Sequence, residues 1–254
     1  MIGKGQKFAS PQPPREMDPF DGVLIVDKPA GPTSHDVVDR IRRKFGFKKV
    51  GHGGTLDPQA TGLLVILLGR GTKLSSVFMG SDKTYQGTMR LGIATDSQDA
   101  QGTVVKEADC SSVTREKLES AMAKFSGDIF QTPPMVSAVK VDGVPLYKLA
   151  RKGETIEREA RLIHVYEFSL LKFEPPRAEF ILKCTKGVYV RTICADIGEI
   201  LGCGAHLEQL RRLQSGKIKI EDATPVGDIL RMSRDELLKK VVPGSRFLTY
   251  GAKE

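Results

Sequence analysis

The chain has 254 residues, of which 40% are hydrophobic and 28% charged, as in an ordinary globular protein. Its net charge of +8 favours a polyanionic partner, because each neutralised phosphate releases condensed counterions. No apolar run approaches the ~20 residues that cross a bilayer, and four cysteines without a CxxC pair indicate neither a disulfide framework nor a zinc site. Since the N-terminus also lacks the apolar core of a secretory signal, we expect a cytoplasmic protein with no membrane contact.

The first elements are predicted from proline content, caps and apolar spacing. Residues 1–20 contain four prolines and almost no apolar periodicity, which predicts a flexible tail. A strand at Val23–Val26 opens the fold, and Ser34 can cap a helix that ends near Gly46. The fully apolar run Leu63–Leu68 is bounded by glycines and predicts a buried strand.

The remaining predicted elements mix helices and strands without strict alternation. Such an order predicts an α+β fold with a mixed or antiparallel central sheet flanked by helices, in place of a doubly wound one. The elements are a helix from Thr72 to Met79, a strand over 85–91, a helix behind a cap at Thr114, a hairpin at Asp142-Gly143, a short helix from Pro145 to Gly153, strands near Leu162–Leu170 and Ala178–Cys184, and a helix through Ile193 and Ile197 that stops at Gly202.

A glycine-rich bend, Gly51–Pro58, places one carboxylate between a basic helix and an apolar strand. Gly53 and Gly54 allow backbone angles that a Cβ would forbid, while Pro58 fixes its own φ and restricts Asp57 before it. Such a bend can aim a carboxylate as a catalyst. Asp-Pro is also a common turn pair, so the bend alone leaves a plain turn open.

Further motifs accompany this bend in a fixed order. They are Gly22–Pro29, Gly31–Asp36, Gly69–Leu74, Lys83–Tyr85, Lys186–Thr192, Leu201–Leu207 and Leu210–Leu213. Over residues 21–215 the set resembles the TruB family of pseudouridine synthases, which act on uridine-55 in the T-loop of tRNA. The resemblance implies a pseudouridine synthase fold with an inserted RNA-binding flap. It also implies an isomerase that flips a uridine from its stack, breaks the C1′–N1 bond and joins C1′ to C5.

The implied reaction fixes what the site must supply. Nothing is oxidised or reduced, so neither a cofactor nor a metal is expected. An ionised carboxylate must act beside C1′, as nucleophile or as base at C2′, and the resemblance assigns this role to Asp57. Burial would raise the pKa of that carboxyl, so it needs a cation, and Arg191 occupies the family's arginine position. Tyr85 is expected beneath the uracil and as acceptor of the C5 proton, and Tyr189 on the same face of an extended segment as Arg191.

Other residues are assigned RNA contacts by the same resemblance. Leu210 matches an apolar contact on the opposite face of the uracil, and His52 matches a histidine that supports the splayed RNA loop. Lys28 stands where the family has a lysine near the site, and both phosphate contact and loop support are open as its role. Specificity is expected from the shape of the folded RNA loop.

Basic side chains elsewhere are expected to touch the RNA backbone without reading sequence. On the first predicted helix and after it these are Arg40, Arg43, Lys44, Lys48 and Lys49. The family's equivalent of residues 125–153 is a mobile insertion that closes over the tRNA stem-loop, and a solvated basic hairpin would explain its charges equally well. In this chain it carries Lys140, Lys148, Arg151 and Lys152.

The domain division follows from where the motifs end. Residues 21–215 are expected to form the catalytic domain and 216–254 a short C-terminal extension. Ser233 and Glu236 can form a capping box for one helix in the extension. It is too short for the RNA-binding PUA domain that commonly ends the family pattern. A monomer is expected, with the T-arm of tRNA as its partner.

Two rival functions are weighed against the isomerase. A non-catalytic tRNA-binding protein that helps tRNA fold would suit the basic clusters, but it would not need Asp57, Arg191 and both tyrosines together. A glycosidase would need two opposed carboxylates, and the matching motifs offer no partner for Asp57. Within the isomerase, a covalent adduct and a glycal are both open as the intermediate.

Overall fold

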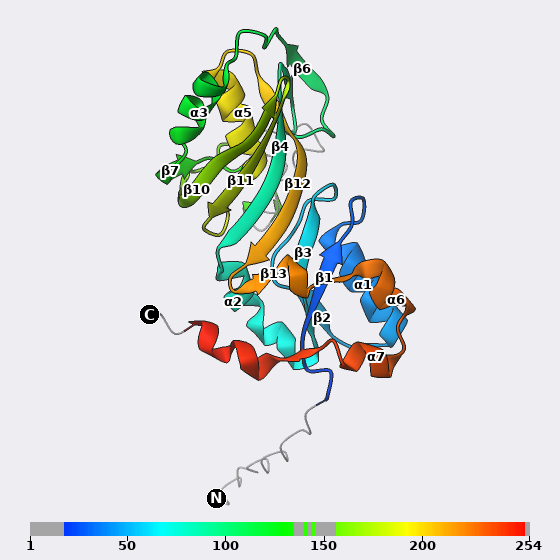
Figure 1. The fold of residues 1–254 in the computed structure, drawn as a ribbon. Helices are drawn as coiled ribbons and strands as arrows, with labels where there is room; N and C mark the ends of the chain where they lie inside the picture. Colours follow the sequence, from blue (N-terminus) through cyan, green and yellow to red (C-terminus); the bar gives the residue numbers. More distant parts are fainter. Residues whose placement is uncertain (1–17, 135–139, 142–143, 146–155, 252–254) are drawn as a thin grey trace, which may run out of the picture.

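A long mixed sheet organises the computed structural model, which describes residues 18–134, 140–141, 144–145 and 156–251 (Figure 1). β12 pairs parallel with β3, and β14 pairs parallel with β1, while the other neighbours are antiparallel. The mixed sheet and its flanking helices confirm the predicted α+β class. In order across the sheet the strands are β14 (Thr224–Pro225), β1 (Gly22–Lys28), β3 (Thr61–Leu68), β12 (Ala205–Ser215), β4 (Lys83–Leu91), β11 (Arg177–Cys184), β10 (Arg161–Glu174) and β7 (Gly127–Gln131), with β2 (Val50–His52) on β3, β13 (Ile218–Lys219) on β12 and β15 (Val242–Pro243) on β1.

Short helices and two small hairpins complete the fold. No helix within the described ranges is long and apolar enough to cross a bilayer. The helices are α1 (Ser34–Phe45), α2 (Ser75–Gly80), α3 (Arg115–Ala123), α5 (Val190–Ile200), α6 (Val226–Arg231) and α7 (Arg234–Leu238), with 3₁₀ turns at Gly69–Leu74, Ile220–Asp222 and Gly244–Gly251, and the hairpins pair β5 (Ile93–Thr95) with β6 (Val104–Glu107) and β8 (Lys140–Val141) with β9 (Val144–Pro145).

Separate cores fill the two halves of the molecule. In one half α3 and α5 cover the sheet formed by β4, β10, β11 and β12 (Figure 1). In the other half β3 is buried on both faces, which explains its unbroken apolar run. Leu64 and Ile66 face a core shared with α1, α6 and α7, while Leu63 and Val65 pack with Phe78 of α2 on the opposite face.

The two halves meet where β4 and β12 pass from one to the other (Figure 1). Tyr85 on β4 and Leu210 on β12 pack partly against both the α3/α5 core and the α1 core. These two side chains therefore mark the junction, and the residues expected to perform catalysis gather around it.

Two predicted helix starts are wrong by a residue or more. The cap of α1 is Thr33, whose hydroxyl accepts from the Asp36 N–H at 3.0 Å, whereas Ser34 is buried and bonds to Leu56. Thr72 does not begin a helix, because its hydroxyl donates to the Gly69 carbonyl within a 3₁₀ turn and α2 starts at Ser75. The predicted end of α1 is confirmed by Gly46, which has a left-handed φ of 68°.

Differences also arise at the two ends of the chain. Phe20, assigned by its sequence context to a tail, is buried against Phe47, because one aromatic ring can be anchored without any local periodicity. The C-terminal segment forms two helices where one was predicted, and β14 and β15 both pair with β1. The Ser233 capping box is confirmed.

The predicted flap elements are described only in part. Pairing of β8 with β9 confirms the hairpin around Asp142-Gly143. Pro145 belongs to β9, so the predicted helix does not begin there, and the rest of that predicted helix lies outside the described residues.

Candidate active site

Side chains from three elements hold the bend that carries Asp57. From β1 the Lys28 ammonium donates to the Pro58 carbonyl at 2.9 Å. From α1 the Ser34 hydroxyl accepts from the Leu56 N–H at 2.8 Å. From β12 the Arg212 guanidinium donates to the carbonyls of Gly54 and Thr55, each at 3.2 Å. A bend bonded from so many sides presents its carboxylate in one orientation, as preorganised catalysis needs.

The two glycines of the bend are needed for different reasons. Gly54 has a φ of 141°, which L side chains rarely adopt. Gly53 has no left-handed φ, and the reason for its glycine is space, since a Cβ there would lie 2.5 Å from the Phe78 Cβ. The predicted need for special backbone angles therefore holds for Gly54 only.

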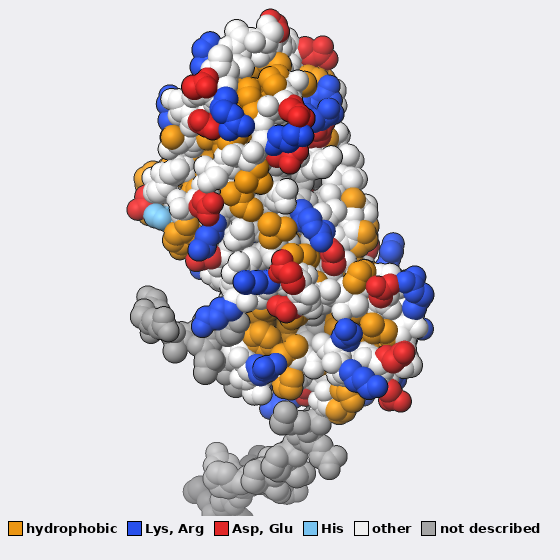
Figure 2. Space-filling model, viewed as in Figure 1, with side chains coloured by type: hydrophobic (Ala, Val, Ile, Leu, Met, Phe, Trp, Pro, Cys, Tyr) orange, Lys and Arg blue, Asp and Glu red, His pale blue; other side chains and the backbone are white. Residues whose placement is uncertain are grey.

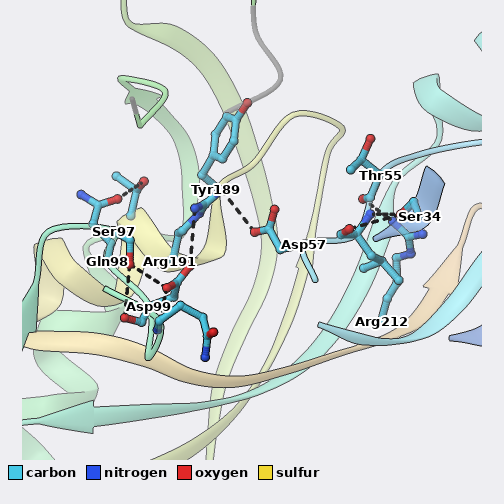
Figure 3. A network of polar contacts seen from close by, with 12 residues as sticks. Ser34, Thr55, Asp57, Ser97, Gln98, Asp99, Tyr189, Arg191 and Arg212 are labelled. Carbon is cyan, nitrogen blue, oxygen red and sulfur yellow. Dashed lines mark hydrogen bonds and ion pairs between the residues drawn. The ribbon is translucent and has the colours of Figure 1, made fainter. Parts of the chain in front are cut away.

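Asp57 and Arg191 are brought together as the resemblance implies. The Arg191 Nη2 lies 3.2 Å from the Asp57 Oδ2, and the arginine side chain is only 5% exposed (Figure 3). Arg191 is the second residue of α5. Tyr189 occupies the N-cap position of that helix, two residues before Arg191. The segment is thus helical where an extended one was predicted. The pair still shares the site, because the Arg191 guanidinium lies 5.9 Å from the centre of the Tyr189 ring.

A second carboxylate, Asp99, reaches the same guanidinium. Its Oδ2 lies 3.5 Å from Arg191 Nη1, and its Oδ1 accepts from the Ser97 hydroxyl at 2.6 Å and the Gln101 N–H at 3.0 Å (Figure 3). The turn before it contains Gln98 at a φ of 65°. Asp99 is therefore held in place, and the Arg191 guanidinium forms ion pairs with both Asp99 and Asp57.

The charge balance around Asp57 is uneven. The carboxylate is 46% exposed and lines both cavities of the site, and partial burial raises the pKa of its carboxyl above the ordinary value of 3.8. Arg191 and, more weakly, Lys28 act to lower this pKa, and Asp99 acts to raise it. The expectation that Arg191 alone offsets burial is thus incomplete, because the second carboxylate works against it.

The cavity beside Asp57 has a volume of about 310 Å³. Tyr85, Tyr189, Arg191 and Leu210 line it together with Asp57, so the structure gathers the five residues expected around the base. A larger adjoining cavity of about 590 Å³ shares Asp57 and Leu210 with it. The carboxylate therefore lies between two connected hollows of one groove.

Tyr189 is positioned through its backbone by one side chain. Gln131, the last residue of β7, accepts from the Tyr189 N–H at 2.8 Å and donates to its carbonyl at 3.1 Å. These two hydrogen bonds resemble the pairing of neighbouring strands, and they act at the N-cap of α5, which has no side-chain cap of its own. Gln131 therefore helps to place Tyr189 and, one residue into the helix, Arg191.

Lys28 is fully buried and supports the bend. Its ammonium donates to the carbonyls of Pro29, Pro32 and Pro58 at 2.8–2.9 Å, and burial lowers the pKa of Lys28 from 10.5 to about 8. Of the two roles left open by the sequence, the geometry supports loop support. The assignment of Lys28 as a substrate-binding residue stays a prediction.

His52 is the last residue of β2 and belongs to the first part of the bend. Its Nδ1 accepts from the Gly54 N–H at 3.3 Å, and burial, with the nearby charge of Arg212, lowers the pKa of the imidazole. A lowered pKa favours the neutral ring. His52 does not line either of the two cavities beside Asp57.

The basic residues expected to touch RNA lie on the solvent side of α1 and the turn after it. Arg40, Arg43, Lys44, Lys48 and Lys49 are all exposed, and Lys and Arg side chains interspersed with acidic ones gather over this part of the surface in Figure 2. Lys140 falls in β8, but its side chain is not described, and Lys148, Arg151 and Lys152 lie outside the described residues.

Metal-ligating side chains do not cluster in the part of the chain that the structure describes: no group of three or more His, Cys, Asp or Glu could hold an ion there. Cys184 and Cys194 are fully buried. Burial raises the pKa of the Cys184 thiol to about 12, so it stays protonated at neutral pH.

Three residues of the site were not predicted from the sequence. Asp99 follows a polar turn with no local pattern that singles it out, and Gln131 is a lone amide at a strand end. Arg212 carries a usable signal. In a strand, one of two consecutive arginines must face each side, so Arg211-Arg212 before Leu213 places one cation on the buried face.

Comparison with known proteins was made on the whole chain. A family model described as the TruB family pseudouridylate synthase N-terminal domain matches residues 42–190, and one described as the tRNA pseudouridylate synthase B C-terminal domain matches residues 191–244. The tRNA pseudouridine synthase B of Opitutus terrae is 52% identical over 232 residues, which cover 91% of this chain and 95% of that protein. The one of Syntrophotalea carbinolica is 47% identical over 89% of this chain and 75% of its own length.

Solved structures agree with the sequence comparison. A chain in the crystal structure of a Cbf5-Nop10-Gar1 complex matches with a TM-score of 0.73 and 30% identity, covering 94% of this chain and 65% of that chain. A chain in a structure of an H/ACA RNP bound to a substrate RNA containing 2′-deoxyuridine matches with a TM-score of 0.68 and 26% identity, over 91% and 61%. The present chain spans less than two thirds of these two solved chains. Sequence motifs, site geometry and both family models lead to one conclusion: the chain belongs to the TruB family of pseudouridylate synthases.

Proposed function

We propose that this chain converts uridine-55 in the T-loop of tRNA to pseudouridine. Membership of the family makes it a pseudouridine synthase, an isomerase, and its curated relatives are named for tRNA. The observation that carries the proposal is the Asp57–Arg191 pair, 3.2 Å apart, in a cavity that two tyrosines and a leucine also line.

Asp57 supplies the negative charge at the sugar. The reaction breaks the C1′–N1 bond, turns the uracil and forms a C1′–C5 bond, while C5 loses a proton and N1 gains one. Asp57 either attacks C1′ or takes a proton from C2′, and in both routes it acts as an ionised carboxylate. Arg191 aims it and opposes its protonation.

The rest of the cavity receives the flipped base. Unstacking a nucleotide costs a few kcal/mol, and stacking on an aromatic ring returns ~1–3 kcal/mol. Tyr85 and Leu210 lie on neighbouring strands of the sheet, where they can hold opposite faces of the uracil, and Tyr189 closes the pocket beside Arg191. Tyr85 also takes the C5 proton in this proposal.

The T-arm as the recognised part of tRNA, a monomer as the active unit and a cytoplasmic site of action belong to the same proposal. The five residues expected around the base all line this cavity, so the proposed active unit needs no side chain from a second copy. The exposed basic face of α1 suits phosphate contacts, and His52 beside the bend suits support of a splayed loop. The basic residues of 140–152 are proposed to grip the stem in the same way.

Replacing Asp57 by asparagine tests the proposal. We expect Asp57→Asn to bind unmodified tRNA with an affinity within about twofold of the wild type, because the amide keeps the shape of the site. Product formation should fall at least about a thousand-fold, because the charge that acts at C1′ is gone. Pseudouridine is mapped by carbodiimide treatment and primer extension on an unmodified tRNA transcript under single-turnover conditions.

Asp109→Asn is the matched control, since Asp109 is exposed and its carboxylate caps a turn at Ser111. Turnover by Asp57→Asn at the wild-type rate would refute the isomerase role of Asp57. A wild-type protein that binds tRNA without forming product would leave the non-catalytic tRNA-binding function. A glycosidase is disfavoured because Asp99, the second carboxylate, is occupied by Arg191 and Ser97.

A further inference from the structure

Arg212 is a buried cation that donates hydrogen bonds to backbone carbonyls around the site. The residue is 2% exposed, and burial of a charge is costly unless it is fully partnered. Its Nε donates to the Leu63 carbonyl at 2.7 Å, and its two Nη atoms donate to the carbonyls of Thr55 and Gly54. Three of its bonds therefore fix the strand and the bend on either side of Asp57, and Figure 3 shows Arg212 beside Thr55 of the bend.

A further partner of Arg212 is the hydroxyl of Tyr85. The two residues are directly opposite each other on β12 and β4, so their side chains leave the sheet on the same face. Both side chains also line the cavity beside Asp57. Burial raises the pKa of the Tyr85 hydroxyl, and the charge and hydrogen bond of Arg212 oppose that rise.

We propose that Arg212 is a positioning residue that joins the two reacting parts of the site, holding the Asp57 bend and placing a positive charge on the oxygen of Tyr85. This inference rests on the proposed function. It adds that the second half of the reaction, loss of the C5 proton, depends on a residue that acts through Tyr85 and the bend.

The chemistry gives Arg212 a specific effect. When the Tyr85 oxygen takes the C5 proton, the C5–H bond breaks and an O–H bond forms, and the proton gained by N1 balances the one lost from C5. The hydroxyl hydrogen of Tyr85 passes to N1 as the C5 proton arrives, so the O–H bond that breaks is replaced by the one that forms and the tyrosine ends unchanged. Negative charge develops on the tyrosine oxygen between these two transfers, and an adjacent guanidinium in a dry site stabilises that charge. A residue that only held the bend would affect C1′–N1 cleavage and leave the C5 step unchanged.

Kinetics with deuterium at C5 separate these roles. Unmodified tRNA is transcribed with uridine or with 5-deuterouridine, and single-turnover rates are compared. Wild-type turnover is measured first and tests the proposed function by itself. For Arg212→Lys, which keeps the charge and loses the fork, we expect a rate at least about tenfold lower, tRNA affinity within about twofold, and a C5 isotope effect larger than that of the wild type.

Arg177→Lys is the control, because Arg177 uses the same fork on Glu208, at 2.7 and 2.9 Å, on the exposed side of the sheet. It should keep the wild-type rate and isotope effect. A slower Arg212→Lys whose isotope effect equals that of the wild type would overturn the proposal, as would an unchanged rate.

Tyr85→Phe provides a second test if Arg212→Lys does not fold, since it leaves the backbone bonds of Arg212 in place. Loss of turnover, or a slow rate with a larger C5 isotope effect, supports the proposal. A rate and an isotope effect equal to those of the wild type would overturn it.

Discussion

Asp57 shares its nearest cation, Arg191, with a second carboxylate, Asp99. Arg191 lowers the pKa of Asp57, while burial and Asp99 raise it, and the net direction is upward. Because the reaction uses the ionised form, activity should fall as the pH drops through this raised pKa. The loss on the acid side therefore begins at a higher pH than an ordinary aspartate would give.

Removing the competing charge should shift that acid limb. In Asp99→Asn the pKa of Asp57 falls, because a negative neighbour is lost and Arg191 is left to Asp57 alone. Single-turnover rates between pH 5 and 8, each normalised to its own plateau, should show the half-maximal point at lower pH than in the wild type. A limb that stays in place or moves upward would show that Asp99 does not set the charge of Asp57.

Chemistry at the residue scale was predictable where a motif carries it. A buried carboxylate requires a cation, and the family resemblance identified Arg191 as that cation for Asp57. Asp99 could not, because it is 42 residues beyond Asp57 in an ordinary polar turn and meets Arg191 only after folding. Lys28 could be placed near the site but not assigned a role, since only the fold shows its ammonium enclosed by three carbonyls.

At the scale of elements, α5 and β12 approach so closely that one glycine separates them. A Cβ on Gly198 would lie 2.0 Å from the backbone nitrogen of Ala205, where neither partner can move without disturbing its element. This approach places the first turn of α5, with Arg191, against the strand that carries Leu210. The packing of helix on strand therefore determines the geometry of the cavity.

Two identical substitutions should have opposite effects on stability. We expect Gly198→Ala to lower the free energy of unfolding by at least about 3 kcal/mol through overpacking. Gly227→Ala on α6 should raise it by about 0.5 kcal/mol, because that glycine is exposed, has open space around it and gains helix propensity. Urea unfolding followed by circular dichroism measures both, and a stable Gly198→Ala would show that the helix can move away from the strand.

Elements were predictable where the pattern is local. The run Leu63–Leu68 and the alternation of Ala178–Cys184 are strands because their burial follows directly from side-chain order. The start of α1 was misplaced because Thr33 and Ser34 are both good caps, and tertiary packing recruits Ser34 to the bend. The very short β14 and β15 have too few residues to show a period, and only their pairing with β1 defines them.

Across the whole molecule, one arginine ties the C-terminal segment to the N-terminal one. The guanidinium of Arg234 lies 4.6 Å from the centre of the Phe20 ring and 5.3 Å from that of Phe47, and it donates to the Phe45 carbonyl. Cation–π contacts of this kind and the packed side-chain stem together hold α7 against the end of α1.

Truncation of Arg234 should loosen this closure. Arg234→Ala is expected to lower the free energy of unfolding by about 1–2 kcal/mol, because two ring contacts are lost. Arg231→Ala, which removes an exposed arginine paired only with Asp228 three residues earlier, should change it by less than about 0.5 kcal/mol. Denaturation midpoints in urea compare the two, and equal midpoints would show that the rings gain nothing from the arginine.

The Asp57–Arg191 pair joins the two cores, since the bend belongs to the α1 half and α5 to the other. Neither half alone can then hold a reacting carboxylate in register with its counterion. A rotation of one half against the other would lengthen the contact between Asp57 and Arg191. Catalytic activity thus requires that the two halves stay packed together. Weakening the contact between them along β4 and β12 should abolish activity while both cores are still folded.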